Sequence, residues 1–188
     1  MRGDSRKAKK GRAKRPRIYV CHTYYHVYVT FLKELRLKSL QQEEASGKAS
    51  SGGQAQLEDT SGKADLVLSR MSNDFEDLKS RVEATGLFAH VYEFDEKRED
   101  FFPKLAKWRK GGGGFLGNLY CRIRFTRLYA QLEAPYVPVD FRDYEDIYVY
   151  CDSDPIGYYL NQNRIYYHAV EDGLDCLKNF PAAFRVFS

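Results

Sequence analysis

Residues 17–22 (RIYVCH) and residues 23–40 (TYYHVYVTFLKELRLKSL) form the stretch that decides the fold. The first segment is short and rich in β-branched and aromatic residues, which is typical of a buried strand. The second segment has the length and apolar spacing of a helix, and Thr23 stands where a helix N-cap is expected. The folded part of the chain therefore begins with a strand that leads directly into a helix.

The same order of strand and helix continues along the chain. Further strands are predicted at residues 64–69, 87–94, 147–151 and 164–170, and further helices at 73–85, 118–133 and 156–160. Residues 95–110 show no clear period. An alternation of this kind predicts an α/β fold in which a Rossmann-like parallel sheet is flanked by helices.

One domain is expected to occupy residues 17–178. The basic residues 1–16 in front of it predict a disordered arm, and residues 179–188 behind it read as a tail. Inside the domain, residues 41–63 are polar and rich in serine and glycine. We therefore expect a flexible insertion between the first helix and the second strand.

The composition indicates a folded protein of a reducing compartment. Aromatic residues make up 15% of the chain, which is too many for a disordered protein. The cysteines lie far apart and form no CxxC pair, which favours buried reduced thiols over disulfides or zinc ligands. They are Cys21, Cys121, Cys151 and Cys176. The charged N-terminus does not resemble a signal peptide and no stretch reads as a membrane span, so a cytoplasmic location is predicted.

The basic residues are concentrated at the N-terminus. Residues 1–17 contain nine lysines and arginines against the single acid Asp4, so the rest of the chain is net acidic although the total charge is +4. Residues 2–17 are therefore a candidate contact for an anionic membrane surface or a nucleic acid, and a solvated arm is the alternative. Beyond the arm, the chain lacks the interleaved aromatic and basic residues of a specific nucleic-acid reader.

Polar residues follow three of the expected strands at the point where each strand ends. These residues are Cys21-His22-Thr23, Asp152-Ser153-Asp154 and Glu171-Asp172-Gly173. The carboxyl ends of parallel strands meet at one edge of a sheet, and ligands bind at that edge in such folds. The sequence thus predicts that the three motifs share one site.

Glu171 and Asp172 are the leading catalytic candidates. Adjacent acids repel each other, and a carboxylate whose pKa is raised by its neighbour can accept a proton from a substrate hydroxyl. Gly173 allows a sharp turn and the close approach of a ligand. The alternative interpretation is a solvated loop whose acids stand at the N-terminus of a helix.

Asp152 and Asp154 allow two different uses. Their carboxylates could hold Mg²⁺ or Mn²⁺ against a nucleotide diphosphate, whereas Pro155 directly after them favours a role in a turn and a helix cap. His22 can bind a substrate at the rim of the sheet, and Tyr24 offers an aromatic surface that suits either a sugar ring or the core. The spacing of the histidines does not match HExxH, so a zinc site is not expected.

Three stretches together resemble one group of bacterial enzymes. Residues 18–26 (IYVCHTYYH), 147–159 (IYVYCDSDPIGYY) and 166–173 (YYHAVEDG) are similar to the N-terminal domain of family 52 glycosyltransferases. That family comprises lipooligosaccharide sialyltransferases and their relatives in capsule synthesis. The resemblance covers residues 18–177 apart from the polar insertion.

The resemblance implies a GT-B architecture of two Rossmann-like domains. It also implies an inverting transfer of sialic acid from CMP-sialic acid to a cell-surface glycan or glycolipid, without a metal or other cofactor. In the family the second acid of the acidic motif is the general base, which would be Asp172, and Glu171 would set its charge and orientation. The implied location is the cytoplasm, peripheral to the inner face of the bacterial membrane.

One motif of the family is missing. The family has a His-Pro pair whose histidine supports the departing CMP phosphate, but the four histidines here are followed by Thr23, Val27, Val91 and Ala169. We therefore expect the chain to supply the acceptor side only and to need a second domain, absent here or on a separate chain, for activity. Two other functions stay open. One is a metal-dependent glycosyltransferase that uses Asp152, Asp154 and a nucleoside-diphosphate sugar, and the other is a non-catalytic glycan-binding or relic domain.

Overall fold

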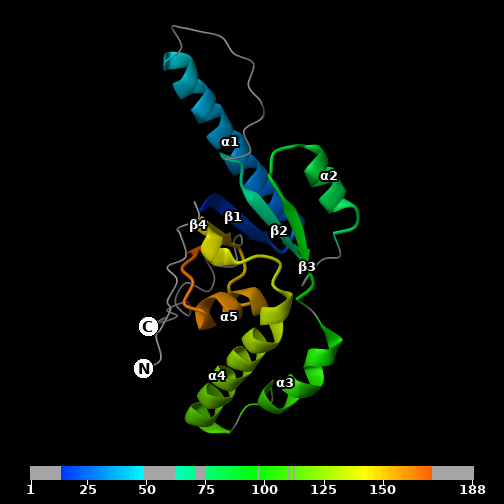
Figure 1. The fold of residues 1–188 in the computed structure, drawn as a ribbon. Helices are drawn as coiled ribbons and strands as arrows, with labels where there is room; N and C mark the ends of the chain where they lie inside the picture. Colours follow the sequence, from blue (N-terminus) through cyan, green and yellow to red (C-terminus); the bar gives the residue numbers. More distant parts are fainter. Residues whose placement is uncertain are drawn as a thin grey trace, which may run out of the picture.

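The computed structural model describes residues 14–48, 62–70, 75–96, 98–109, 111 and 113–170. These residues form a parallel five-stranded sheet in the order β3-β2-β1-β4-β5, with helices on both faces (Figure 1). The predicted Rossmann-like α/β fold is therefore confirmed. The strands are β1 (Arg15–Cys21), β2 (Asp65–Ser69), β3 (Val91–Phe94), β4 (Tyr144–Val149) and β5 (His168–Ala169).

Helices and short 3₁₀ turns connect the strands. The helices are α1 (Tyr24–Lys48), α2 (Leu78–Ala84), α3 (Phe102–Arg109), α4 (Gly114–Glu133) and α5 (Pro155–Gln162). The 3₁₀ turns are η2 (Glu99–Phe101), η3 (Ala134–Tyr136) and η4 (Phe141–Asp143). No helix in these described stretches is long and apolar enough to cross a membrane.

The two faces of the sheet form separate cores because side chains alternate along each strand. Tyr19 and Cys21 of β1 point to the face covered by α1 and α2, where Val82 is buried. Ile18 and Val20 point to the opposite face, which α5 covers. A third cluster joins the hairpin of α3 and α4 to α5, and this hairpin extends away from the sheet (Figure 1).

The basic arm is shorter than predicted. β1 begins at Arg15, so residues 15 and 16 belong to the sheet. The guanidinium of Arg15 lies 2.6 Å from a carboxylate oxygen of Asp65, and Arg17 donates two hydrogen bonds of 2.7 Å to Glu34 on α1. These acids are buried, and a buried acid is retained when a cation is paired with it. Arg15, which was assigned to the arm, and Arg17, which was predicted to begin the first strand, therefore hold the domain together.

The predicted insertion is also shorter, because α1 continues through residues 41–48. Gln41, Gln42 and Glu43 are good helix formers, and they let the helix extend beyond the domain. In the remainder of the predicted insertion, residues 49–61 lie outside the described residues and residues 62–63 are described just before β2.

Residues 95–110 contain a helix that the sequence pattern did not show. Pro103 lies in the first turn of α3, where a missing N–H costs nothing, and Leu105 is buried against Tyr129 of α4. The contact with a distant helix, which no local period shows, therefore stabilises α3.

Several predicted boundaries shift inward. The helix predicted from residue 73 begins at Leu78, because Asp77 adopts a left-handed conformation with φ of 53°. β3 and β5 are shorter than predicted and begin at Val91 and His168. Among the described cysteines no disulfide forms, and Cys21 is buried as predicted, whereas Cys121 and Cys151 are half-buried. Residues 171–188, including Cys176, lie outside the described residues.

Candidate functional site

Side chains from three strand ends meet at the carboxyl edge of the sheet. His22 follows β1, Glu96 comes shortly after β3, and Asp154 comes shortly after β4. The Nε2 atom of His22 lies 3.3 Å from Oε1 of Glu96 and 3.6 Å from Oδ2 of Asp154. His22 and Glu96 are fully buried, whereas Asp154 keeps some contact with solvent. With Glu133, described below, these residues are named the His22 cluster.

Glu96 connects the cluster to two helices. One carboxylate oxygen, Oε2, accepts a hydrogen bond of 2.9 Å from the backbone N–H of Ile156 in α5. The backbone carbonyl of Glu96 accepts a hydrogen bond of 3.1 Å from the hydroxyl of Tyr129 in α4. The remaining oxygen, Oε1, faces His22 and has no hydrogen-bond partner among the described residues. Glu96 therefore positions α4 and α5 while it presents one oxygen to His22.

Glu133, the last residue of α4, is a second fully buried acid whose electrostatic environment includes Glu96. Neither of its carboxyl oxygens has a hydrogen-bond partner in the described part of the chain. Burial, followed by the charge of Glu96, raises the pKa of Glu133 to about 8 against the opposing effect of Arg98. The carboxyl group of Glu133 is therefore mostly protonated at neutral pH, so the site holds a proton inside the protein.

Local hydrogen bonds hold the end of β1 in place. Nδ1 of His26 accepts a hydrogen bond of 3.1 Å from the backbone N–H of His22, and the ring of His26 stacks on Tyr150 with centroids 4.5 Å apart. The Thr23 hydroxyl oxygen accepts a hydrogen bond of 3.2 Å from the N–H of His26, which is the predicted cap of α1. Thr23 and His26 thus have structural roles that fix His22.

A cation could be held by a different set of residues from the pair that the sequence indicated. Donor atoms of His22, Cys151 and Asp154 lie within 4.8 Å of one another. Asp152 does not belong to this group, and its Oδ2 accepts a hydrogen bond of 3.5 Å from the hydroxyl of Tyr167. Nitrogen, sulfur and oxygen donors together suit Zn²⁺ better than Mg²⁺. Of the two aspartates that the sequence indicated, Asp154 belongs to this group.

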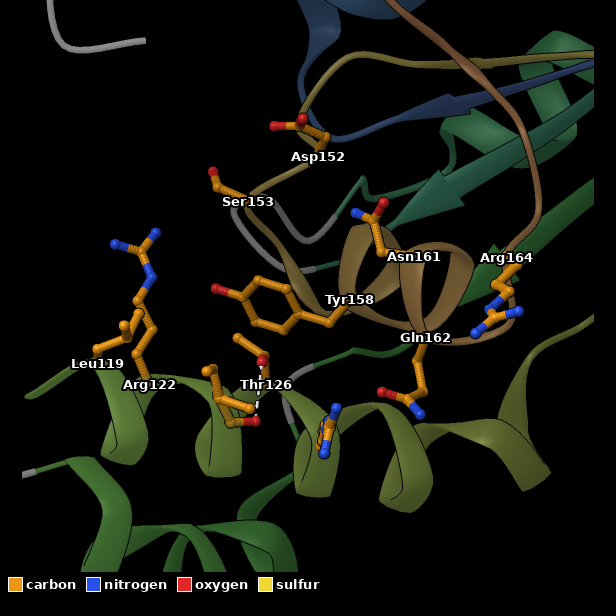
Figure 2. A pocket seen from close by; sticks show the side chains of 11 residues that line it. Leu119, Arg122, Thr126, Asp152, Ser153, Tyr158, Asn161, Gln162 and Arg164 are labelled. Carbon is orange, nitrogen blue, oxygen red and sulfur yellow. Dashed lines mark hydrogen bonds between the residues drawn. The ribbon is translucent and has the colours of Figure 1, made fainter. Parts of the chain in front are cut away.

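A cavity of about 700 Å³ opens beside Asp152 and Ser153, between α4 and α5 (Figure 2). Polar side chains of both helices line it, among them Thr126, Tyr158 and Asn161. Gly157 makes this arrangement possible, because a Cβ at residue 157 would overlap the backbone carbonyl of Asp152. The volume falls within the range of small-ligand sites, which is about 300–1,000 Å³.

Arginines give the cavity a positive character. Arg122 and Arg127 line it from α4, and Arg164 lines it from the segment after α5. None of the three forms an ion pair with another described residue. Figure 2 shows the guanidinium of Arg122 directed toward Ser153. Such unpaired guanidinium groups suit a ligand that carries a carboxylate or a phosphate.

The predicted site residues have different positions in the structure. His22 and Asp154 lie together in the His22 cluster, Asp152 lines the cavity, and Thr23 caps α1. Tyr24 is exposed at the start of α1, edge-on to Phe75 at 5.3 Å between ring centroids.

The structure does not describe the predicted catalytic motif. Glu171, Asp172 and Gly173 lie outside the described residues. The last described residue, Val170, donates a hydrogen bond of 2.8 Å from its N–H to the carbonyl of Val149, at the carboxyl end of β4. The described chain therefore ends at the edge that carries Asp152 and Asp154.

Sequence patterns did not indicate Glu96, Glu133 or the cavity arginines. Glu133 has one sequence signal, since it is the single acid in an otherwise apolar and neutral run over residues 128–139. Arg122 and Arg127 line a common cavity only because α4 packs against α5. These two helices are distant in sequence, so no local pattern indicates the cavity.

Comparison with known proteins identifies no relative. No family model matches the chain, and neither a curated protein nor a solved structure matches it.

Proposed function

We propose that this domain binds the acceptor glycan of a sialyltransferase-like glycosyltransferase. One observation supports the proposal: His22, Asp154 and the cavity beside Asp152 lie together at the carboxyl edge, and Val170, the last described residue, is hydrogen-bonded at the same edge. His22, Asp152 and Asp154 belong to the segments on which the resemblance to family 52 rests. Parallel α/β sheets bind their ligands at this edge.

The surfaces around this edge fit a sugar. The exposed ring of Tyr24 offers an apolar face for a pyranose, while the cavity offers hydroxyl and amide groups that pair with sugar hydroxyls. Arg122 and Arg127 would neutralise a carboxylate or a phosphate on the bound saccharide. The cavity is large enough to enclose a sugar residue together with such a group.

The proposed reaction transfers the sialyl group with inversion. Asp172 takes the proton of the acceptor hydroxyl, and the hydroxyl oxygen forms a bond to the anomeric carbon of the donor. The bond between that carbon and the phosphate oxygen of CMP breaks, and CMP leaves with the electron pair. Glu171 sets the charge and orientation of Asp172 in this step. The proposed mechanism uses side chains of the protein and no metal ion.

Transfer and binding assays on the full chain test this proposal. The chain is incubated with CMP-sialic acid and a panel of bacterial surface glycans, with EDTA or with Mn²⁺, and glycan binding is measured on an array. Transfer in EDTA is the expected result when a donor-binding partner is present. Activity that needs Mn²⁺ would assign the metal-dependent alternative, and binding without transfer from any donor would assign the non-catalytic one. A chain that neither binds a glycan nor transfers sialic acid would contradict the proposal.

A further inference from the structure

The hairpin of α3 and α4 carries large apolar side chains in solvent. Phe115 and Leu116 at its tip are 81% and 77% exposed, and Leu119, Tyr120 and Ile123 follow them along α4, each at least 40% exposed. Figure 1 shows that the hairpin points away from the sheet, so the domain itself does not cover this end. We name these five residues the outer stripe.

The outer stripe occupies one side of α4. Its members recur at the spacing of residues that share a helix face, and they lie apart from the side chains that pack inward. The inward contacts use Phe125 and Tyr129, which are packed with Leu105 of α3. α4 therefore buries one apolar face in the hairpin and presents another to the outside.

The hairpin is also strongly basic. Between Phe102 and Leu132 the sequence has no acidic residue. Its cations are Lys104, Lys107, Arg109, Lys110, Arg122, Arg124 and Arg127. Arg122 and Arg124 lie on either side of Ile123 in the outer stripe, and Arg124 approaches Trp108 with its Cζ 5.2 Å from the ring centroid. An exposed apolar stripe bordered by arginines is the pattern of helices that lie at a membrane interface.

We propose that the α3–α4 hairpin binds to the surface of an anionic lipid bilayer. The outer stripe enters the boundary between headgroups and acyl chains, and the cations pair with lipid phosphates. A second copy of the same hairpin is a poorer occupant of the stripe, because a symmetric contact would bring arginines against arginines. The bilayer satisfies the apolar and the charged part of this surface together.

The inference goes beyond the proposed function and does not depend on it. It also has a geometric consequence for the site, because Leu119 and Ile123 belong to the outer stripe and line the cavity between α4 and α5. When the hairpin is bound in this way, the cavity lies next to the bilayer surface. The ligand of the cavity would then be one that is presented at a membrane.

Trp108 provides a built-in probe, because it is the single tryptophan of the chain and packs against Tyr120 of the outer stripe. The full chain is titrated with vesicles of brominated phosphatidylcholine and phosphatidylglycerol, and binding and quenching of tryptophan fluorescence are recorded. We expect binding and quenching with these vesicles, and at least tenfold weaker binding to vesicles of phosphatidylcholine alone.

Two double variants locate the contact. Phe115→Ser with Leu116→Ser should weaken vesicle binding by about tenfold or more and remove the quenching. Leu32→Ser with Leu35→Ser is the matched control, because both leucines are about half exposed on α1. This control should bind as the parent does. Circular dichroism verifies that both variants are folded.

Three results would overturn the proposal. One is vesicle binding without quenching of Trp108, which would assign the contact to the basic residues before β1. Another is equal binding by the two double variants. The third is a lack of vesicle binding together with a dimer that Phe115→Ser and Leu116→Ser disperse, because the outer stripe would then be covered by a second copy.

Discussion

At the amino edge of the sheet the buried acid Asp65 has a hydrogen-bond donor for each oxygen. At the carboxyl edge the buried acids Glu96 and Glu133 keep oxygens that accept no hydrogen bond from a described residue, although Oε1 of Glu96 lies 3.3 Å from Nε2 of His22. Oδ2 of Asp65 accepts hydrogen bonds of 2.6 Å from Arg15 and from the hydroxyl of Tyr144. Oδ1 accepts a hydrogen bond of 3.1 Å from the N–H of His90. In the described chain, three carboxyl oxygens of the two glutamates have no hydrogen-bond partner.

The difference separates structural acids from candidate functional ones. Native proteins satisfy nearly all buried polar groups, and Asp65 follows this rule while it joins β1, β2 and β4. Unsatisfied buried acids cost stability, so a chain that keeps them at a ligand-binding edge gains something else from them. We therefore propose that the amino edge is architectural and that the carboxyl edge is the functional one.

The largest effect is expected at the carboxyl edge, from Asp172→Asn. If Asp172 is the general base, this substitution should lower the rate of sialyl transfer by about 100- to 10,000-fold. The free energy of unfolding should change by less than about 0.5 kcal/mol. Steady-state kinetics with the donor-binding partner present and urea unfolding measure the two quantities. An active Asp172→Asn variant would contradict the role of this residue, and Glu171→Gln provides the matched control with a smaller loss.

The second effect belongs to the amino edge. Asp65→Ala leaves Arg15 and Tyr144 without their buried acceptor, so it should lower the free energy of unfolding by about 3–5 kcal/mol. Asp100→Ala is the control, because Asp100 is exposed and its 3.7 Å contact with Arg98 should contribute less than about 1 kcal/mol. If urea unfolding showed equal losses of unfolding free energy for Asp65→Ala and Asp100→Ala, the structural role of Asp65 would be contradicted.

The third effect depends on pH and concerns Glu133. Its pKa in the folded protein is about 8, above the ordinary value of 4.5, so the folded state binds more protons than the unfolded state between these values. Stability therefore falls as pH rises from about 4.5 to 8, and Glu133→Gln should abolish this fall.

The free energy of unfolding is measured at two pH values. At pH 8 the Glu133→Gln variant should be more stable than the parent by on the order of 3 kcal/mol, and at pH 4.5 the two should be nearly equal. Glu83→Gln, at an exposed position of α2, should show no such difference. If the difference in stability between the parent and Glu133→Gln were the same at both pH values, Glu133 would be ionised in the folded protein and the prediction would be wrong.

The smallest effect is that of one hydroxyl at the amino edge. Tyr144→Phe removes the donor of the 2.6 Å hydrogen bond to Asp65 and should cost about 1–3 kcal/mol. Tyr166→Phe, at an exposed position before β5, should cost nothing measurable. Thermal unfolding distinguishes the two, and an unchanged melting temperature for Tyr144→Phe would show that Asp65 does not need this donor.

The sequence predicted the fold well because the fold depends on local pattern. The apolar run of β1 and the cap at Thr23 are visible in residues 17–23, and the alternation of elements does the rest. α3 was missed because its stability depends on the contact between Leu105 and α4.

The candidate site was predicted only in part. His22 and Asp154 were found because they follow strands, which a local pattern shows. Glu96 and Glu133 come into one region because the fold places the end of α4 near the segment after β3. No spacing along the sequence predicts this. A buried acid also looks like a solvated one in the sequence until its surroundings are known.

Glycan binding by two tyrosine variants is the most direct test of the central claim that the carboxyl edge is the functional one. Tyr24→Ala removes an exposed ring at the carboxyl edge, and Tyr166→Ala removes an exposed ring on the amino side of β5. The glycan bound most tightly on the array is titrated against both variants by saturation-transfer NMR. We expect Tyr24→Ala to weaken binding by about tenfold and Tyr166→Ala to leave it unchanged. Equal binding by the two variants, or a loss confined to Tyr166→Ala, would contradict the assignment.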